Sequence, residues 1–352
     1  MRNRLGVVTV AVIQSTLISC SAEDGVAVRQ EALDAAVKAE EFRKITSVLV
    51  SYRGELVSES YWAPGAADYL NNTRSATKSL TAMAVGAAIA DGAITDVDAP
   101  AFSWFETERP FRFSTELKEQ ITVSDLLTMS SALDCDDNEW STPGNEEHMY
   151  PARRWTFFTV DLPTKEDYRR DERGYGPFSY CTAGVFLLGQ IIERATGEPV
   201  DEYVERRLLK PLGVDRVRWH RSPSGEIMTG GGTELTSRAL LKLADLALDG
   251  GTRDDERVLP ASWVREMTTA RVTAREGVDY GYLWWRQDFA CGGGAASGWF
   301  MSGNGGNKVV VFRELELAVV ITAQLYGTRG MHQQSTDIIE KYVLPGVPAC
   351  SS

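Results

Sequence analysis

The segment 75–91 constrains the fold of this chain most strongly, because its helical pattern is apolar on nearly every face. Many alanines surround Leu80, Met83 and Val85 there, and Gly92 follows as a helix stop. A helix with this pattern has no face suited to water, so other elements must surround it. The sequence therefore predicts a molecule built around one central, buried helix.

Strand-like segments flank a long helical block. Two β-rich runs, 45–52 and 56–62, come first, and residues 53–55 between them suit a three-residue hairpin connection. Strands, helices and strands in this order predict an α+β fold: an antiparallel sheet flanked by helices, with an inserted α-rich subdomain at about 93–275. Residues 134–179 lack periodicity, and so long a loop is expected at the rim of a functional site. Further strands are expected at 280–286, 297–301, 308–313 and 317–324, and helices at 31–41, 123–129, 183–196, 200–209, 237–248 and about 328–343.

The N-terminal end predicts export. Arg2 and Arg4 precede an apolar run at 5–18, which is too short to span a bilayer and is typical of a signal peptide. The run ends in Leu-Ile-Ser-Cys, which resembles the bacterial lipobox, where cleavage before Cys20 is coupled to its acylation. We therefore expect a cell-envelope lipoprotein held at a membrane by lipid chains, or a secreted protein if Cys20 is incidental. The expected organisation is a signal peptide at 1–19, an anchored linker with the first helix at 20–44, one domain at 45–343 and a tail at 344–352.

The charge of the chain argues against nucleic acid as a partner. Its 49 acidic side chains outnumber 37 basic ones and give a net charge of −12, which repels phosphate. The three histidines are scattered and no Cys-x-x-Cys occurs, so a metal site is not expected. An acidic run at 134–139 lacks the EF-hand spacing and predicts a solvated rim rather than a calcium site; its members are Asp134, Asp136, Asp137, Asn138 and Glu139.

Ser75 and Lys78 are the first candidates for chemistry. They form Ser-x-x-Lys at the start of the central helix, where free backbone N–H groups and the helix dipole favour an anion. A serine hydroxyl needs a base to become a nucleophile, and a lysine buried in an apolar helix can lose its charge and act as that base. The pattern is short, so a helix-capping serine with a snorkelling lysine is the alternative.

Two further motifs follow in chain order. Tyr180 precedes the helix expected at 183–196, and residues 302–306 form a glycine-rich connection between two strands. Glycine permits close approach of the backbone to a ligand. Taken singly, the two segments also suit a core tyrosine and a hairpin turn.

Together these motifs resemble the serine β-lactamase and penicillin-binding protein superfamily. The branch is the class C β-lactamase-like one, with its esterases, D-amino-acid peptidases and 6-aminohexanoate-dimer hydrolase, and the resemblance runs over about 45–343. Ser75 with Lys78 looks like the first motif and Tyr180 like the second, Tyr-x-Asn, in which Thr182 replaces the asparagine. The resemblance is also carried by Arg74, Ser79, Leu80, Gly86, Gly189, Glu193, Gly197, Gly230, Trp263 and the segment 280–285.

The third motif of the family, Lys-Thr-Gly, aligns in two ways. One alignment uses Met301, Ser302 and Gly303, and the other uses 304–306. We prefer the first, because it places the Asn304 N–H directly after the glycine, where the family donates its second oxyanion hydrogen bond. Met301 then removes a cation that receives substrate carboxylates, which predicts a preference for uncharged short-acyl esters or amides over penicillins and cephalosporins.

The resemblance implies a serine hydrolase that acts on small esters or amides through an acyl-enzyme, without a cofactor. Ser75 attacks the carbonyl, Lys78 and Tyr180 transfer the proton, and the N–H groups of Ser75 and Asn304 hold the oxyanion. Two alternatives remain: a non-catalytic lipoprotein that binds peptidoglycan-like peptides, and a true β-lactamase or D-amino-acid peptidase. Ser124 with Asp125 imitates a class A motif, but these residues are predicted to begin a helix.

Four cysteines remain after Cys20 and allow three disulfide connectivities in an exported chain. The resemblance implies that Cys135 bonds Cys181, because Cys181 neighbours Tyr180 and Cys135 ends the helix that borders the site in the family fold. Cys291 and Cys350 then form the second pair.

Overall fold

The computed structural model describes residues 25–351. Within them, eight strands form one antiparallel sheet in the order β2-β1-β13-β12-β11-β10-β9-β8. The first strands of the chain therefore lie beside the last one, which confirms the expected α+β fold with a sheet drawn from both chain ends. The strands are β1 Ile45–Tyr52, β2 Glu55–Tyr61, β8 Val272–Arg275, β9 Val278–Tyr280, β10 Trp285–Cys291, β11 Gly294–Gly303, β12 Asn307–Phe312 and β13 Leu317–Ala323.

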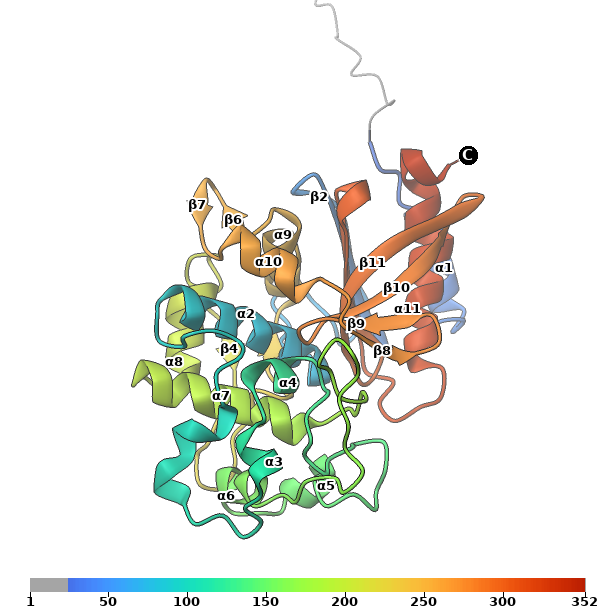
Figure 1. Ribbon diagram of the computed structural model, residues 1–352. Coiled ribbons are helices and arrows are strands. Elements are labelled where there is room, and N and C mark those ends of the chain that lie inside the picture. The colour runs from blue at the N-terminus through green and yellow to red at the C-terminus, as the bar shows by residue number, and fades with distance from the viewer. Residues whose placement is uncertain (1–24, 352) are drawn as a thin grey trace, which may run out of the picture.

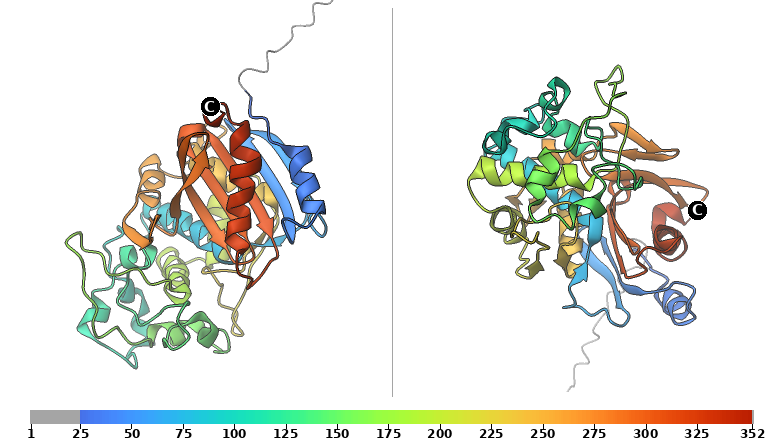
Figure 2. Two further views of the ribbon diagram at one scale, coloured as in Figure 1. Left: turned by 90° about the vertical axis from the view of Figure 1, so that its right-hand side faces the viewer. Right: turned by 90° about the horizontal axis from the view of Figure 1, so that it is seen from below.

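Both faces of the sheet are covered, which explains the unbroken apolar runs of its central strands. Along β1, Val48 and Val50 belong to the core under the C-terminal helix, whereas Leu49 belongs to the core around the central helix. The outer face carries the first and last α-helices of the described chain (Figure 2). These are α1 Gln30–Lys38 and α11 Met331–Ile338, and the other face carries α2 Thr77–Ala90 and α9 Ser237–Leu248.

Helix α2 is the central helix that the sequence predicts. Every residue in the span 77–88 is buried, and a short 3-10 turn, Arg74–Ala76, leads into it. It packs against α7, Thr182–Thr196, which ends at Gly197 in the left-handed conformation. Further helices form the part of the molecule away from the sheet (Figure 1): α3 Glu116–Glu119, α4 Val123–Leu127, α5 Glu146–Met149, α6 Trp155–Val160 and α8 Val200–Val204. Helix α10, Ala261–Met267, packs on α2.

Two small sheets complete the fold. Strand β3, Asn71–Asn72, pairs with β5, Glu234–Leu235, and so holds the chain just before Ser75. Thr122 caps α4, and Asp125 closes a capping box with it, so Ser124 and Asp125 begin a helix as predicted. The other short strands are β4 Val217–Arg218, β6 Thr252–Arg253 and β7 Glu256–Arg257.

The connection between β1 and β2 is shorter than expected. It contains two residues, Arg53 and Gly54, and Glu55 already pairs with Tyr52. Both turn residues have positive φ, at 53° and 78°, and such a turn matches the twist of the two strands.

The prediction of one continuous strand at 280–286 is wrong, because β9 ends at Tyr280 and β10 begins at Trp285. The backbone reverses between them: Leu283 has φ of 57°, and the Gly281 N–H bonds the Trp284 carbonyl oxygen. The apolar residues of this segment enter the core through a turn rather than through a strand.

The boundaries of the domain are wider than 45–343. Leu33 of α1 is fully buried in the same core as Ile338, and Cys350 forms a disulfide with Cys291 of β10. The first helix and the expected tail therefore pack as parts of the domain. The α-rich insertion is narrower, because α9 lies on the sheet and β8 belongs to it.

The expected signal peptide and Cys20 lie outside the described residues. None of the helices within 25–351 combines the length and the apolar character that a membrane crossing requires.

Candidate active site

Ser75 and Lys78 meet at the start of α2. Lys78 is 1% exposed, and its Nζ donates to Ser75 Oγ at 3.1 Å, to Thr182 Oγ1 at 2.9 Å and to the Gly230 carbonyl oxygen. Three neutral oxygens thus surround the amine, and no carboxylate of the described residues forms an ion pair with it. A buried amine bonded to a half-buried serine hydroxyl is an arrangement that can move a proton on and off Ser75.

Tyr180 lies on the other side of Lys78, just before α7. The Lys78 Nζ is 4.9 Å from the centre of the Tyr180 ring, which stacks on Trp285 at 5.7 Å. Among the hydrogen bonds of the described residues, none joins the Tyr180 hydroxyl to Ser75 or Lys78. Its part in proton transfer therefore stays a prediction that rests on this proximity.

Thr182, which replaces the asparagine of the second motif, contacts Lys78. Its side chain is fully buried, and its hydroxyl accepts the hydrogen bond from Lys78. The shorter side chain at the position of the family's asparagine therefore still holds the lysine.

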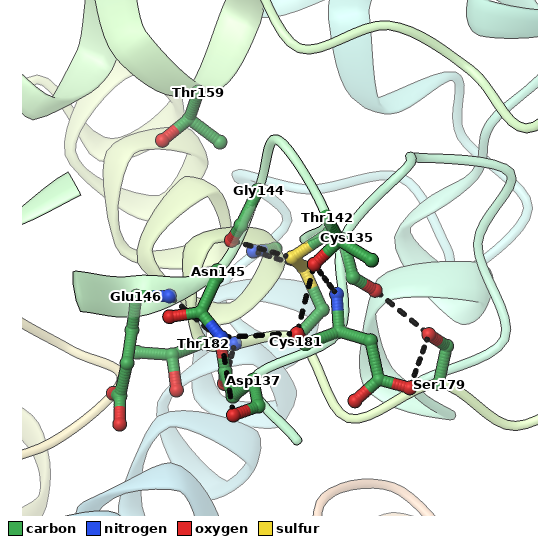
Figure 3. Close-up of a disulfide and its surroundings, with 12 residues drawn as sticks. Cys135, Asp137, Thr142, Gly144, Asn145, Glu146, Thr159, Ser179, Cys181 and Thr182 are labelled. Atoms are coloured by element: carbon green, nitrogen blue, oxygen red, sulfur yellow. Dashed lines mark hydrogen bonds between the residues drawn. A yellow bond between two sulfur atoms is a disulfide. The ribbon is translucent and has the colours of Figure 1, made fainter. Parts of the chain in front are cut away.

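Asp137 lines the cleft beside Ser75. The sequence analysis had assigned it, with its acidic neighbours, to a solvated rim. Its carboxylate accepts hydrogen bonds from the backbone N–H of Thr182 at 2.8 Å and of Glu146 at 2.9 Å (Figure 3). Burial raises the pKa of Asp137 to about 6, and the charge of Lys78 opposes this shift. The sequence of the acidic run does not reveal this contact, because it depends on the loop folding back onto the start of α7.

A disulfide joins the same loop to the tyrosine segment. Cys135 bonds Cys181 as the resemblance implied, so the start of the loop is covalently fixed beside Tyr180 (Figure 3). Ser179 Oγ adds a hydrogen bond to the Cys135 carbonyl oxygen at 2.7 Å. Within residues 25–351, no group of three or more His, Cys, Asp or Glu side chains is arranged to hold a metal ion.

The end of β11 brings the third motif against Ser75. A Cβ at Gly303 would lie 2.1 Å from the Thr73 carbonyl oxygen, so glycine alone allows this approach. An added Cβ at Gly305 or Gly306 would instead meet Tyr326 or Met331. The packing therefore favours the alignment that uses Met301, Ser302 and Gly303. Met301 is buried in the core, and Asn304 is exposed. Ser302, Gly303 and Asn304 line the cleft together with Ser75 and Tyr180.

The cleft has two arms that share Ser75, Glu146 and Asn304. We call the first the His220 hollow: it has a volume of about 680 Å³, and its wall includes Glu147, Tyr150, Trp155, His220 and Arg221. The second is the Lys308 hollow, of about 730 Å³, whose wall includes Phe178, Tyr180, Arg275, Trp285, Phe300, Ser302, Lys308 and His332. Substrate groups on either side of a scissile bond at Ser75 thus have separate chemical surroundings.

Lys308 was missed as a site residue, since it lies in an apolar strand that the sequence assigns to the core. It pairs with Ser302 across the β11–β12 ladder and is 2% exposed. Burial lowers the pKa of the Lys308 amine to about 7. A lysine among the apolar residues of this strand is an unusual position in the sequence, but it does not reveal the cleft.

Comparisons with known proteins agree with this geometry. The chain is 28% identical over 229 residues to the 6-aminohexanoate-dimer hydrolase of Paenarthrobacter ureafaciens, an alignment that covers 63% of this chain and 57% of the relative. It is 29% identical over 158 residues to esterase EstB of Burkholderia gladioli, covering 42% of this chain and 38% of the esterase. The chain thus spans little more than half of the first relative and less than half of the second.

A solved structure shows the same fold. The D-stereospecific amidohydrolase from a Streptomyces species superposes with a TM-score of 0.65 at 22% identity, over 89% of this chain and 97% of that one. The model of the β-lactamase family matches residues 33–342, and this span contains every candidate catalytic residue named above. The chain belongs to the β-lactamase family.

Proposed function

We propose that the protein is a serine hydrolase that cleaves small esters or amides through an acyl-enzyme on Ser75. The observation that carries this proposal is the hydrogen bond between the buried Lys78 amine and Ser75 Oγ, at the junction of the two hollows. A lysine retained for snorkelling would reach solvent, whereas this one is 1% exposed. The names of the relatives, a dimer hydrolase and an esterase, support the same chemistry.

Acylation begins when Lys78, acting as the general base, takes the proton of Ser75 Oγ. The oxygen forms a bond to the substrate carbonyl carbon, and the bond from that carbon to the leaving oxygen or nitrogen breaks. The leaving atom receives the proton, with Tyr180 as the relay between Lys78 and the departing group. Water then attacks the acyl carbon and gives one proton to Lys78, the bond from that carbon to Ser75 Oγ breaks, and this proton passes to Ser75 Oγ.

The oxyanion of each step is proposed to bind the backbone N–H groups of Ser75 and Asn304. The contact of Gly303 with the Thr73 carbonyl supports this assignment, because it brings the chain at Asn304 close to the Ser75 turn. Fixed donors of this kind commonly supply the largest electrostatic contribution to acyl transfer.

Export is proposed on separate grounds. The lipobox-like residues at 17–20 follow a signal-like run, and two disulfides suit an oxidising compartment. A lipid chain on Cys20 would hold the hydrolase at a membrane surface.

Covalent labelling with a fluorophosphonate tests the proposed activity. The purified protein should be labelled and should hydrolyse p-nitrophenyl butyrate, and Ser75→Ala should abolish both. Ser124→Ala is a matched control, because that serine belongs to a capped helix outside the two hollows. Labelling of the Ser75→Ala protein at the level of the parent would contradict the proposal, and a folded parent that is not labelled would favour a non-catalytic binding protein.

A further inference from the structure

One side-chain amide joins three segments around the candidate nucleophile. Asn307 is the first residue of β12 and is 2% exposed. Its Nδ2 donates to the Asn304 carbonyl oxygen at 2.9 Å and to the Asn72 carbonyl oxygen at 3.3 Å. Its Oδ1 accepts the Ala323 N–H of β13 at 3.2 Å. The amide therefore links the third-motif turn, the chain just before Ser75 and the neighbouring strand.

The partners of Asn307 fix the orientation of its amide. The group has two hydrogens to donate, and two carbonyl oxygens accept from it. The reverse orientation would place the amide oxygen against both carbonyl oxygens and the amide hydrogens against an N–H group. Among side chains of this length, only an amide donates twice and accepts at the same time. The position therefore requires asparagine for its hydrogen bonds as well as for its size.

The segments that Asn307 links contain the two proposed oxyanion donors. Neither the Ser75 N–H nor the Asn304 N–H bonds an acceptor within residues 25–351. Both residues line the cleft, so the two N–H groups can bind a substrate oxygen. The side chain of Asn304 is held elsewhere, because its Oδ1 accepts the Gly327 N–H at 2.8 Å.

Other contacts hold the rest of the third-motif turn. The Gly305 carbonyl oxygen accepts the Leu325 N–H at 3.1 Å, and the Gly306 carbonyl oxygen accepts the Ser335 hydroxyl at 2.6 Å. These partners come from the segment after β13. Of the side chains that bond the turn in the described chain, Asn307 is the one that also bonds the segment before the nucleophile.

Oxyanion donors lower the barrier only when they are fixed at the place where charge develops. A displacement of about 1 Å in a reacting site can lower a rate by about 100-fold. Asn307 lines neither hollow, so it does not touch the substrate. Its effect on the reaction would therefore pass through the positions of Ser75 and Asn304.

We propose that Asn307 is a positioning residue, which holds the N–H groups of Ser75 and Asn304 at the separation that the reaction needs. This inference rests on the proposed hydrolase function and adds the group that sets the geometry of its oxyanion site. The alternative is an amide that stabilises the sheet without affecting the reaction.

Asn307→Ala removes both donated hydrogen bonds. For p-nitrophenyl butyrate, we expect kcat/KM of the folded variant to fall by about 10- to 100-fold, with most of the loss in kcat. Butylboronic acid gives a second readout: its boron forms a bond to Ser75 Oγ, the hydroxyl proton passes to Lys78, and a boron-bound oxygen occupies the oxyanion site. Its inhibition constant should rise by a factor similar to the loss of kcat/KM.

Ser335→Ala is the matched control. Ser335 is fully buried and bonds the same turn at Gly306, but it makes no bond to the segment before Ser75. This variant should have a lower melting temperature without a comparable loss of kcat/KM. Equal losses of kcat/KM in the Asn307 and Ser335 variants would overturn the proposal, as would parental activity in folded Asn307→Ala.

Asn307→Asp provides a second variant in case the alanine variant does not fold. It keeps the shape of the side chain, but an ionised carboxylate donates no hydrogen bond, whereas a protonated one donates once. The ratio of its kcat/KM to that of the parent should therefore be low at neutral pH and should rise as the pH falls. A ratio of one at neutral pH would contradict the positioning role.

The parent protein separates this inference from the proposed function. If the parent hydrolyses the ester and reacts with a fluorophosphonate at Ser75 while Asn307→Ala is unimpaired, only the role of Asn307 is refuted. If the folded parent does neither, the hydrolase function itself is refuted, together with the oxyanion site that Asn307 is proposed to hold.

Discussion

The hydroxyl of Thr182 accepts a hydrogen bond from the Lys78 amine at 2.9 Å, at the position where the second family motif has asparagine. Thr182→Val keeps the shape of the side chain and removes the acceptor, so one donor of the buried amine is left unpaired. We expect kcat/KM for p-nitrophenyl butyrate to fall by about tenfold, in line with loss of a hydrogen bond to a charged or basic group. Thr182→Ser should retain most of the activity, and equal activities of Val and Ser variants would contradict this role.

The raised pKa of Asp137 predicts that kcat/KM falls on the acidic side of its pH profile. Its pKa of about 6 lies above the ordinary value of 3.8, and the ionised carboxylate accepts two backbone hydrogen bonds beside Lys78. Activity should therefore fall as the pH drops through about 6. In Asp137→Asn this limb should be displaced, because an amide does not titrate and cannot accept both bonds equally well. Superposable profiles of kcat/KM for parent and variant would exclude Asp137 as its source.

The same shift predicts the pH dependence of stability. Because the folded-state pKa of Asp137 is raised, its ionisation costs folding free energy: the cost is absent below about 4 and fully present above about 6. The free energy of unfolding of the parent, relative to Asp137→Asn, should therefore increase as the pH falls across this window. Urea unfolding of both proteins at several pH values measures the difference and cancels the similar contribution of Asp245.

The close contact at Gly303 predicts that any side chain there will clash with the backbone. An added Cβ would lie 2.1 Å from the Thr73 carbonyl oxygen, and backbone must move to relieve the contact. Gly303→Ala should abolish most esterase activity by moving Asn304 and Ser75 apart. Gly293→Ala is the control, since a Cβ there meets no atom within 4 Å. Comparable activity in the two variants would show that the close approach is dispensable.

Loss of the Cys135–Cys181 disulfide should lower both kcat and stability, whereas loss of the Cys291–Cys350 disulfide should lower stability alone. Replacing Cys135 and Cys181 by serine releases the loop that carries Asp137, so kcat should fall together with stability. Replacing Cys291 and Cys350 affects the outer side of the sheet and should lower stability alone. Loop entropy suggests about 4 kcal/mol for each. The two cases are distinguished by measuring thermal unfolding and kcat of both double variants, with kcat assayed well below the midpoint of thermal unfolding. Equal losses of kcat in the two variants would contradict this prediction.

Cys20→Ala tests the anchor. The variant should leave the membrane pellet for the soluble fraction without a change in specific activity, because the active-site residues lie in the described domain. Equal membrane association of variant and parent would rule out lipidation of this cysteine.

The sequence allowed prediction of the elements whose signals are local. The apolar faces of 75–91 identified α2, and the order of strands and helices identified the sheet. The disulfides came from the family resemblance. By contrast, the turn at Leu283 interrupts a segment whose apolar residues looked like one strand, since residues buried in a turn and in a strand share the same composition.

Tertiary packing explains the two missed site residues. Asp137 lies in a run of acidic residues typical of solvent, and its burial depends on a loop that returns to α7. Lys308 looks like an isolated polar position in a core strand, and its relation to the cleft depends on its pairing with Ser302. Neither relation is encoded in the residues next to them.

The pairing of β1 with β13 has a kinetic consequence. Ile45 lies beside Ala323 in the sheet, so one of its ladders joins segments from opposite ends of the described chain. During synthesis from the N-terminus, β1 is complete long before its neighbour exists, and folds rich in such distant pairings form slowly. The third motif, in β11, also arrives late and must still meet Ser75. Because the third motif lies in β11, the candidate site is complete only after most of the described chain has been made.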